Sequence, residues 1–133
     1  MIVVDASILL VGLVDDDADG DAARRRLREQ VLLAPDLVYL EVSSVLRRHV
    51  AAERLDRRRA ELALEDLLAL PLRTVEHLPL VKRIWQLRDT VTVYDAAYVA
   101  VAEHFNAPLI TGDARLARAP GPTCTIELFP PEI

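Results

Sequence analysis

The stretch Ile2-Val3-Val4-Asp5, at the start of the chain, sets the fold class that this sequence predicts. Three β-branched residues in succession are typical of a short strand that is buried on both faces. Similar apolar runs recur at 32–34, 72–75, 108–111 and 124–127, and helical patterns separate them. Strands that alternate with helices indicate βα units. We therefore expect an α/β fold with a short central parallel sheet flanked by helices on both faces.

The segments between these runs carry apolar residues at helical spacing. We expect helices over 6–14, 18–31, 36–53, 56–70, 80–88 and 93–105. Among 133 residues there is no internal repeat, no low-complexity tract and no stretch that resembles an interdomain linker. This length suits one domain, so we expect a single domain over 1–133.

The composition restricts the classes of function that are open to this chain. It has 52% hydrophobic and 28% charged residues, which is typical of a globular protein and excludes a disordered one. A single cysteine, Cys124, excludes a disulfide scaffold and suits a reducing compartment. The first residues do not resemble a targeting signal, and no apolar run approaches the roughly 18 residues that span a bilayer. We expect a cytoplasmic protein with no membrane segment.

Four acidic residues stand out by their positions: Asp5, Glu41, Asp95 and Asp113. Asp5 and Asp113 follow predicted strands, and the carboxyl ends of parallel strands share the edge of a sheet at which ligands bind. Glu41 lies on the apolar face of its predicted helix. Asp95 is the only charged residue in an otherwise uncharged run from 92 to 102. We refer to these four side chains as the site carboxylates.

Each of the four also has a purely structural interpretation. Asp5 could cap the helix that follows it, and Asp95 could complete a capping box with Thr92. Asp113 could be an ordinary turn residue, since Gly-Asp is a common turn dipeptide. For Glu41 the alternative is a salt bridge to the Arg47-Arg48 pair, but these arginines lie nearly two helical turns away.

Together, the four acids point to a metal site. Carboxylates that meet at one edge of a sheet repel one another, and a divalent cation would relieve that repulsion. Oxygen ligands without His or Cys suit Mg²⁺ or Mn²⁺. Such a metal site activates water for attack on a phosphodiester. Ser7 and Thr111, each two residues from a site carboxylate, could orient that water or a carboxylate.

Four segments carry a resemblance to a known family: 2–7, 40–42, 94–100 and 109–113. In this order and spacing the sequence resembles the PIN-domain nucleases, in particular the VapC-type toxins of bacterial toxin–antitoxin pairs. By position, the resemblance makes the site carboxylates the catalytic metal ligands, with Ser7 and Thr111 as polar supporting residues. Ala114-Arg115 stands where some members carry a further acid.

The resemblance implies a Mg²⁺- or Mn²⁺-dependent endoribonuclease that forms a homodimer and is inhibited by a small cognate antitoxin, a VapB-like protein. The net charge of −5 means that RNA must find positive charge locally. Candidate RNA contacts are Arg47, Arg48 and Arg88. The alternative is a PIN-fold module that binds other proteins and has no catalytic activity.

Overall fold

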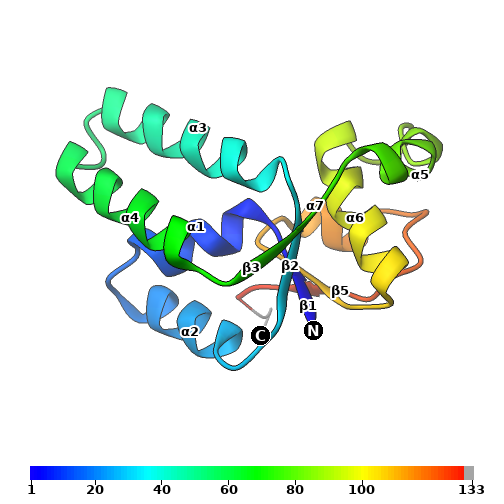
Figure 1. Cartoon of the computed structure of the whole chain (residues 1–133), viewed down its shortest axis with the longest axis horizontal. Coiled ribbons are helices and arrows are strands. Elements are labelled where there is room, and N and C mark those ends of the chain that lie inside the picture. The colour runs from blue at the N-terminus through cyan, green and yellow to red at the C-terminus, as the bar shows by residue number, and fades with distance from the viewer. Residues whose placement is uncertain (131–133) are drawn as a thin grey trace.

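A five-stranded parallel sheet lies at the centre of the computed structural model, which describes residues 1–130 (Figure 1). The strands are β1 (Ile2–Val4), β2 (Leu32–Pro35), β3 (Leu72–Val75), β4 (Leu109–Thr111) and β5 (Ile126–Leu128). They are hydrogen-bonded in the order β3-β2-β1-β4-β5, and every neighbouring pair is parallel. The first strand of the sequence is therefore the middle strand of the sheet.

Strand β1 is central because its side chains are apolar on both faces. Ile2, Val3 and Val4 are at most 3% exposed. Val3 lies opposite Leu33 of β2 on one side and Leu109 of β4 on the other. The register places the carboxyl ends of β1 and β4 next to each other, so the residues that follow these two strands lie at one edge.

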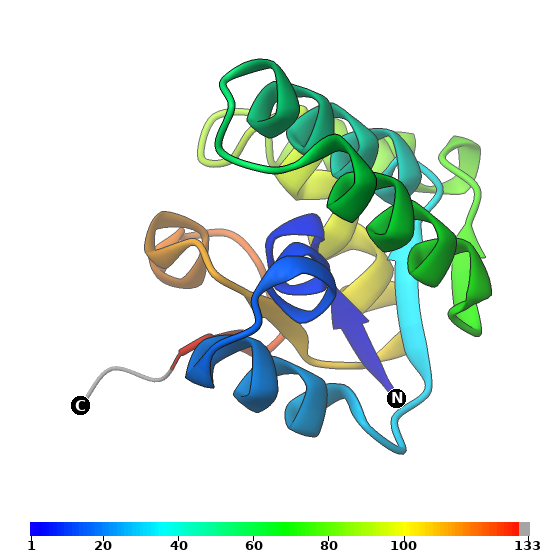
Figure 2. The same ribbon diagram turned by 90° about the vertical axis from the view of Figure 1, so that its left-hand side faces the viewer.

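Helices cover both faces of the sheet. They are α1 (Ala6–Val14), α2 (Ala18–Leu27), α3 (Val38–Ala51), α4 (Arg57–Ala69), the short 3-10 helix η1 (Leu78–Leu80), α5 (Val81–Gln86), α6 (Val93–Phe105) and α7 (Ala114–Arg118). Helices α1 to α4 lie on one side of the sheet, and α5 and α6 lie on the other (Figure 1). Figure 2 shows α3 and α4 running side by side next to α1. The fold class expected from the sequence is confirmed.

The structure differs from the predicted elements most clearly in three places; elsewhere helix ends shift by one or two residues, and the helix expected over 80–88 is α5 preceded by η1. The second helix ends at Leu27, four residues earlier than expected, and Glu29 takes a left-handed conformation with φ of 62°. The last strand is Ile126–Leu128 and not 124–127. Helix α7, of five residues, was not expected, because so short a helix shows no apolar periodicity. Residues 131–133 of the expected domain lie outside the described residues.

Within residues 1–130, every helix is too short or too polar to cross a membrane.

A close contact between helices joins the end of α1 to α2. The amide of Gly20 donates to Asp15 Oδ1 at 3.2 Å, and Arg24 Nη1 donates to the carbonyls of Gly12 and Asp15, each at 2.9 Å. A Cβ at position 20 would lie 1.9 Å from the Asp15 carbonyl oxygen. Only glycine fits there.

Helix α3 is fixed at its start by a residue that follows the neighbouring edge strand, β3. Leu37, its N-cap, has no side-chain capping group of its own. Its backbone N–H donates to His77 Nε2 at 3.0 Å. His77 follows β3 and so ties that edge of the sheet to the helix that carries Glu41.

Candidate active site

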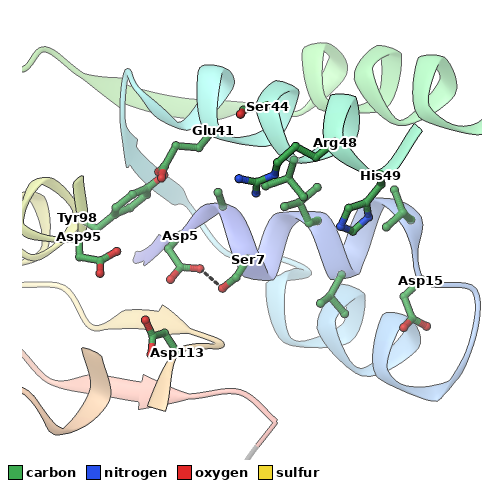
Figure 3. Close-up of a pocket in the computed structure, with 15 residues that line it drawn as sticks. Asp5, Ser7, Asp15, Glu41, Ser44, Arg48, His49, Asp95, Tyr98 and Asp113 are labelled. Atoms are coloured by element: carbon green, nitrogen blue, oxygen red, sulfur yellow. Dashed lines mark hydrogen bonds between the residues drawn. The ribbon is translucent and has the colours of Figure 1, made fainter. Parts of the chain in front are cut away.

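The four site carboxylates line one pocket, of about 580 Å³, at the carboxyl edge of the sheet. They come from four separate places: the ends of β1 and β4, the first turn of α3 and the first turn of α6. In Figure 3 the carboxylates of Asp5, Asp95 and Asp113 point toward a common space, and Glu41 reaches toward it from α3. The structure thus brings together all four acids that the sequence singled out.

Both oxygens of Asp5 are held by hydroxyl groups. Ser7 Oγ donates to Oδ1 and Thr111 Oγ1 donates to Oδ2. Each hydroxyl in turn accepts a backbone N–H at 3.0 Å, from Gly112 and Asp113 respectively. Because the hydroxyl oxygens are occupied by these amides, their protons are directed at the carboxylate. Ser7 and Thr111 therefore hold Asp5 in place, and their supporting role at a metal site stays a prediction.

Glu41 has a partner that the sequence did not reveal. The hydroxyl of Tyr98 in α6 donates to Glu41 Oε1 at 2.5 Å. Tyr98 is 1% exposed, whereas Glu41 is half-buried. No ion pair among residues 1–130 joins Glu41 to Arg47 or Arg48, so the structural alternative considered for Glu41 does not apply within that part of the chain.

Asp5, Asp95 and Asp113 also take part in helix capping. Asp5 Oδ1 accepts the N–H of Ile8 at 3.3 Å at the start of α1, and Asp113 Oδ1 accepts that of Arg115 at 2.8 Å at the start of α7. Asp95 donates its own N–H to Thr92 Oγ1, the N-cap of α6, at 3.1 Å. The structural and functional interpretations of these acids are therefore compatible.

The pocket raises the pKa of three site carboxylates. For Asp5, burial raises the pKa, and the hydrogen bonds from Ser7 and Thr111 offset only part of this effect. For Glu41 and Asp95, burial is again the largest cause. The charges of neighbouring site carboxylates add to it in both cases. The negative charges in the pocket thus act against one another.

Of the three predicted RNA contacts, only Arg48 lines this pocket. Arg47 lies on the opposite side of α3, against α4. The Arg88 guanidinium stacks 4.4 Å from the centre of the Trp85 ring, and its Nη1 donates to the Trp85 carbonyl at 2.8 Å. Arg47 and Arg88 are therefore not part of the acidic site.

The pocket continues away from the carboxylates as an apolar channel between α1 and α3. Its apolar lining residues are Leu10, Val11 and Val14 of α1 and Val45 of α3. Figure 3 shows Arg48, His49 and Asp15 toward the same end. The site thus has an acidic end and a mainly apolar end that also carries Arg48, His49 and Asp15. The apolar end had no signal in the sequence beyond ordinary amphipathic helices.

Tyr98 is the functional candidate that sequence reasoning missed. It lies within the all-apolar stretch of α6, where an aromatic residue is expected to be core packing. The sequence does carry a signal, because a buried tyrosine hydroxyl needs a hydrogen-bond partner.

The donor chemistry of the pocket fits Mg²⁺ or Mn²⁺. All four acids offer oxygen ligands, and no ion pair within residues 1–130 includes any of them. As the side chains stand, no three Asp, Glu, His or Cys side chains in that part of the chain are placed to enclose one metal ion. The residues for a hard cation are therefore present around the pocket, and the ligand set stays a prediction.

Comparison with known proteins identifies the class. A family model described as the PIN domain matches residues 2–122. In curated relatives, Ribonuclease VapC1 of Mycobacterium tuberculosis is 42% identical over 127 residues, covering 95% of this chain and 96% of the relative. Ribonuclease VapC12 of the same organism is 39% identical over 128 residues, covering 96% of this chain and 98% of the relative. The chain belongs to the PIN-domain family and, within it, to the VapC group.

Solved structures share the fold at lower sequence identity. The M. tuberculosis toxin VapC20, described as cleaving the sarcin-ricin loop, superposes with a TM-score of 0.69 at 21% identity, over 88% of this chain and 93% of that one. FitAcB from Neisseria gonorrhoeae superposes with a TM-score of 0.71 at 14% identity, over 96% of each chain. At these identities the likeness supports the fold alone. The resemblance inferred from the sequence is confirmed.

Proposed function

We propose that this chain is an endoribonuclease that hydrolyses RNA phosphodiester bonds with the help of Mg²⁺ or Mn²⁺. The observation that carries the proposal is the gathering of four carboxylates from four elements in one pocket, without an ion-pair partner among residues 1–130. Two relatives of about 40% identity that bear the name ribonuclease support it.

In this proposal Asp5, Glu41, Asp95 and Asp113 hold the cation and Ser7 and Thr111 keep Asp5 in place. The bound cation supplies an activated water and neutralises charge on the scissile phosphate. Asp5 presents a carboxylate whose orientation is fixed by two hydroxyl protons. Arg48, in the same pocket, is suited to contact an adjacent RNA phosphate. Arg47 and Arg88 would contact RNA only beyond the pocket.

We further propose that a small antitoxin protein inhibits the enzyme at this pocket. The solved neighbour VapC20 is described as a toxin. An acidic end next to an apolar end favours an amphipathic segment that carries a basic residue, because such a segment satisfies both ends at once. An RNA substrate and a protein inhibitor of this kind also favour a cytoplasmic location.

A homodimer is proposed on a separate observation. Five large apolar residues on η1, α5 and the start of α6 are exposed: Leu78 (84%), Val81 (52%), Trp85 (62%), Val93 (51%) and Tyr94 (64%). Exposed apolar residues of this size support an interface between two copies of the chain. Replacing Trp85 by serine should shift the molar mass measured by light scattering from that of a dimer to that of a monomer.

The decisive experiment incubates antitoxin-free protein with total cellular RNA and maps new 5′ ends. Four samples are compared: protein with Mg²⁺, protein with EDTA, Asp95→Asn with Mg²⁺, and Asp89→Asn with Mg²⁺. Asp89 is an exposed acid six residues before Asp95 and lies outside the pocket, so it controls for loss of charge. We expect discrete cuts in the first and last samples only.

Two results would contradict the proposal. Cuts that persist in EDTA or in Asp95→Asn would exclude the carboxylate mechanism. Folded protein that neither cuts RNA nor binds Mn²⁺ would favour the alternative, a PIN-fold module that acts by protein–protein contact.

A further inference from the structure

Tyr98 is the one side chain in the core of α6 that can form a hydrogen bond. All residues from Ala96 to Ala102 are buried, and the others in this segment are alanine or valine. Tyr98 also has the largest side chain among the fully buried residues described. Phenylalanine would fill the same space without a polar group, so the hydroxyl calls for an explanation beyond packing.

The hydroxyl contacts a site carboxylate and also the backbone of Ala6, at the start of α1. It donates to Glu41 Oε1 at 2.5 Å, across 57 residues of sequence. That distance is typical of a hydrogen bond from a hydroxyl to a charged carboxylate. Among residues 1–130 no other hydrogen bond to the Glu41 side chain is formed, so Oε2 remains open to a ligand.

The contact parallels the arrangement around Asp5. There, two hydroxyls that are themselves held by backbone amides fix both carboxylate oxygens. Tyr98 also provides a fixed donor, but in a different way. Its ring is buried in the core, so the position of its hydroxyl is fixed and restrains the Glu41 side chain. Glu41, with three side-chain torsions and a half-exposed position, has most to gain from such a fixed donor.

Helix α6 links this donor to a second site carboxylate. Tyr98 follows Asp95 by three residues, so the two side chains lie on one face of the helix. Both line the pocket (Figure 3). One rigid element therefore sets the position of Asp95 directly and of Glu41 through the phenol.

We propose that Tyr98 is a positioning residue of the metal site, whose phenol O–H holds Glu41 Oε1 and leaves Oε2 to bind the cation. The inference rests on the proposed function, since it concerns affinity for Mg²⁺ or Mn²⁺. Groups that orient metal ligands in this way are typically worth 10- to 100-fold in metal affinity.

The test measures the affinity of the purified full chain for Mn²⁺. Electron paramagnetic resonance gives the concentration of free Mn²⁺, from which Kd is obtained. Tyr98→Phe keeps the ring and removes the donor. Tyr94→Phe is the matched control, because it removes a hydroxyl from an exposed residue of the same helix. We expect Kd for Mn²⁺ to rise at least tenfold in Tyr98→Phe and to stay within twofold in Tyr94→Phe.

A double-mutant cycle separates positioning from mere structural support. If Tyr98 acts through Glu41, Tyr98→Phe should change Kd less than twofold when it is added to Glu41→Gln. RNA cleavage by Tyr98→Phe should be reduced at limiting Mn²⁺ and recover at saturating Mn²⁺. Circular dichroism in EDTA confirms that each variant is folded. Should Tyr98→Phe fail to fold, 3-fluorotyrosine at all tyrosines strengthens the donor and should tighten Mn²⁺ binding.

The remaining outcomes overturn either the positioning role of Tyr98 alone or the nuclease proposal with it. The positioning role is refuted if Tyr98→Phe has the Kd for Mn²⁺ of wild type, or if Tyr98→Phe raises Kd equally in wild type and in Glu41→Gln. Either result leaves the nuclease proposal intact. Fluorinated protein with unchanged Kd also refutes the positioning role. Wild-type protein that does not bind Mn²⁺ refutes both.

Discussion

Asp5 shows how a single residue can serve folding and chemistry at once. Its Oδ1 caps α1, and both its oxygens are held by the hydroxyls of Ser7 and Thr111. It is 7% exposed, and burial raises its pKa. A charged carboxylate at this depth is therefore destabilising for the metal-free fold, even though its hydrogen bonds are satisfied.

We predict that the site carboxylates make the metal-free protein less stable as the pH rises. Below their ordinary pKa values of 3.8 and 4.5, the Asp and Glu carboxyls are protonated in both the folded and the unfolded chain. As the pH increases, the unfolded chain ionises first, because folding raises the pKa of Asp5, Glu41 and Asp95. The free energy of unfolding should fall until the pH exceeds the raised values.

Thermal unfolding in EDTA, at pH 4 to 8, checks this prediction. Asp95→Asn removes one repelling charge, so its Tm in EDTA should exceed that of wild type, and the difference should grow with pH. Added Mn²⁺ should reverse the order by stabilising wild type more than the variant. Curves that stay parallel at every pH would show that the carboxylates do not repel one another.

At the scale of elements, the pattern of apolar residues predicted the strands and the longer helices, which show a clear period. It did not predict features that depend on one particular contact between residues. The strand of Ile2, Val3 and Val4 and the buried helix α6 follow from burial alone. Helix α7 exists because Asp113 caps a single turn, and five residues carry no period. Tyr98 was missed because only the fold brings its hydroxyl to Glu41. No sequence pattern pairs residues 41 and 98.

The junction of α1 and α2 gives a prediction for Gly20. Alanine there would place a Cβ 1.9 Å from the Asp15 carbonyl oxygen, and a backbone atom cannot move away as a flexible side chain can. We expect Gly20→Ala to lower the free energy of unfolding by about 2 kcal/mol or more. Urea denaturation measures it. Gly12→Ala is the control, since its Cβ would meet nothing closer than 3.9 Å; equal stability of the two variants would refute the clash.

The start of α3 gives a second prediction at this scale. His77→Ala removes the acceptor of the Leu37 N–H. An unpaired donor at a buried helix start costs about 1–3 kcal/mol, and we expect a loss of this size in urea denaturation. His77→Gln offers an amide oxygen in place of Nε2 and should recover part of it. If alanine and glutamine variants are equally stable, the hydrogen bond contributes nothing.

At the scale of the whole molecule, one ion pair joins three segments on the α5–α6 side of the sheet. Arg83 Nε and Nη2 donate to the two oxygens of Glu103 at 2.6 and 3.0 Å, which joins α5 to α6. Thr123 adds its N–H at 2.8 Å and its hydroxyl at 2.9 Å, and Arg83 also reaches the Gly121 carbonyl at 3.0 Å. This network anchors the segment between α7 and β5.

We predict that Glu103→Gln destabilises the fold by about 1–3 kcal/mol at pH 7. Burial raises the pKa of Glu103, but hydrogen bonds from Arg83 and Thr123 outweigh it and the net pKa is lowered. The stabilisation is therefore complete above the ordinary pKa of 4.5 and is lost as the pH falls through the lower folded value.

Urea denaturation at pH 7 and at pH 3 provides the measurement. The difference between wild type and Glu103→Gln should shrink at the lower pH. Glu61→Gln breaks an exposed pair with Arg57, 3.4 Å apart, and should change stability by less than about 1 kcal/mol. A gap between wild type and Glu103→Gln that is unchanged at pH 3 would contradict the ionic contribution.

Asp5 and Asp113 cap helices, and this affects how loss of activity can be recognised in related sequences. In a related chain without nuclease activity both aspartates would still cap α1 and α7, so their presence alone does not demonstrate activity. Glu41 caps no helix in this fold and accepts only the Tyr98 hydroxyl among residues 1–130. A related sequence in which Glu41 is replaced and Tyr98 is phenylalanine is therefore a better sign of lost activity. Checking only whether all four acids are present is less informative.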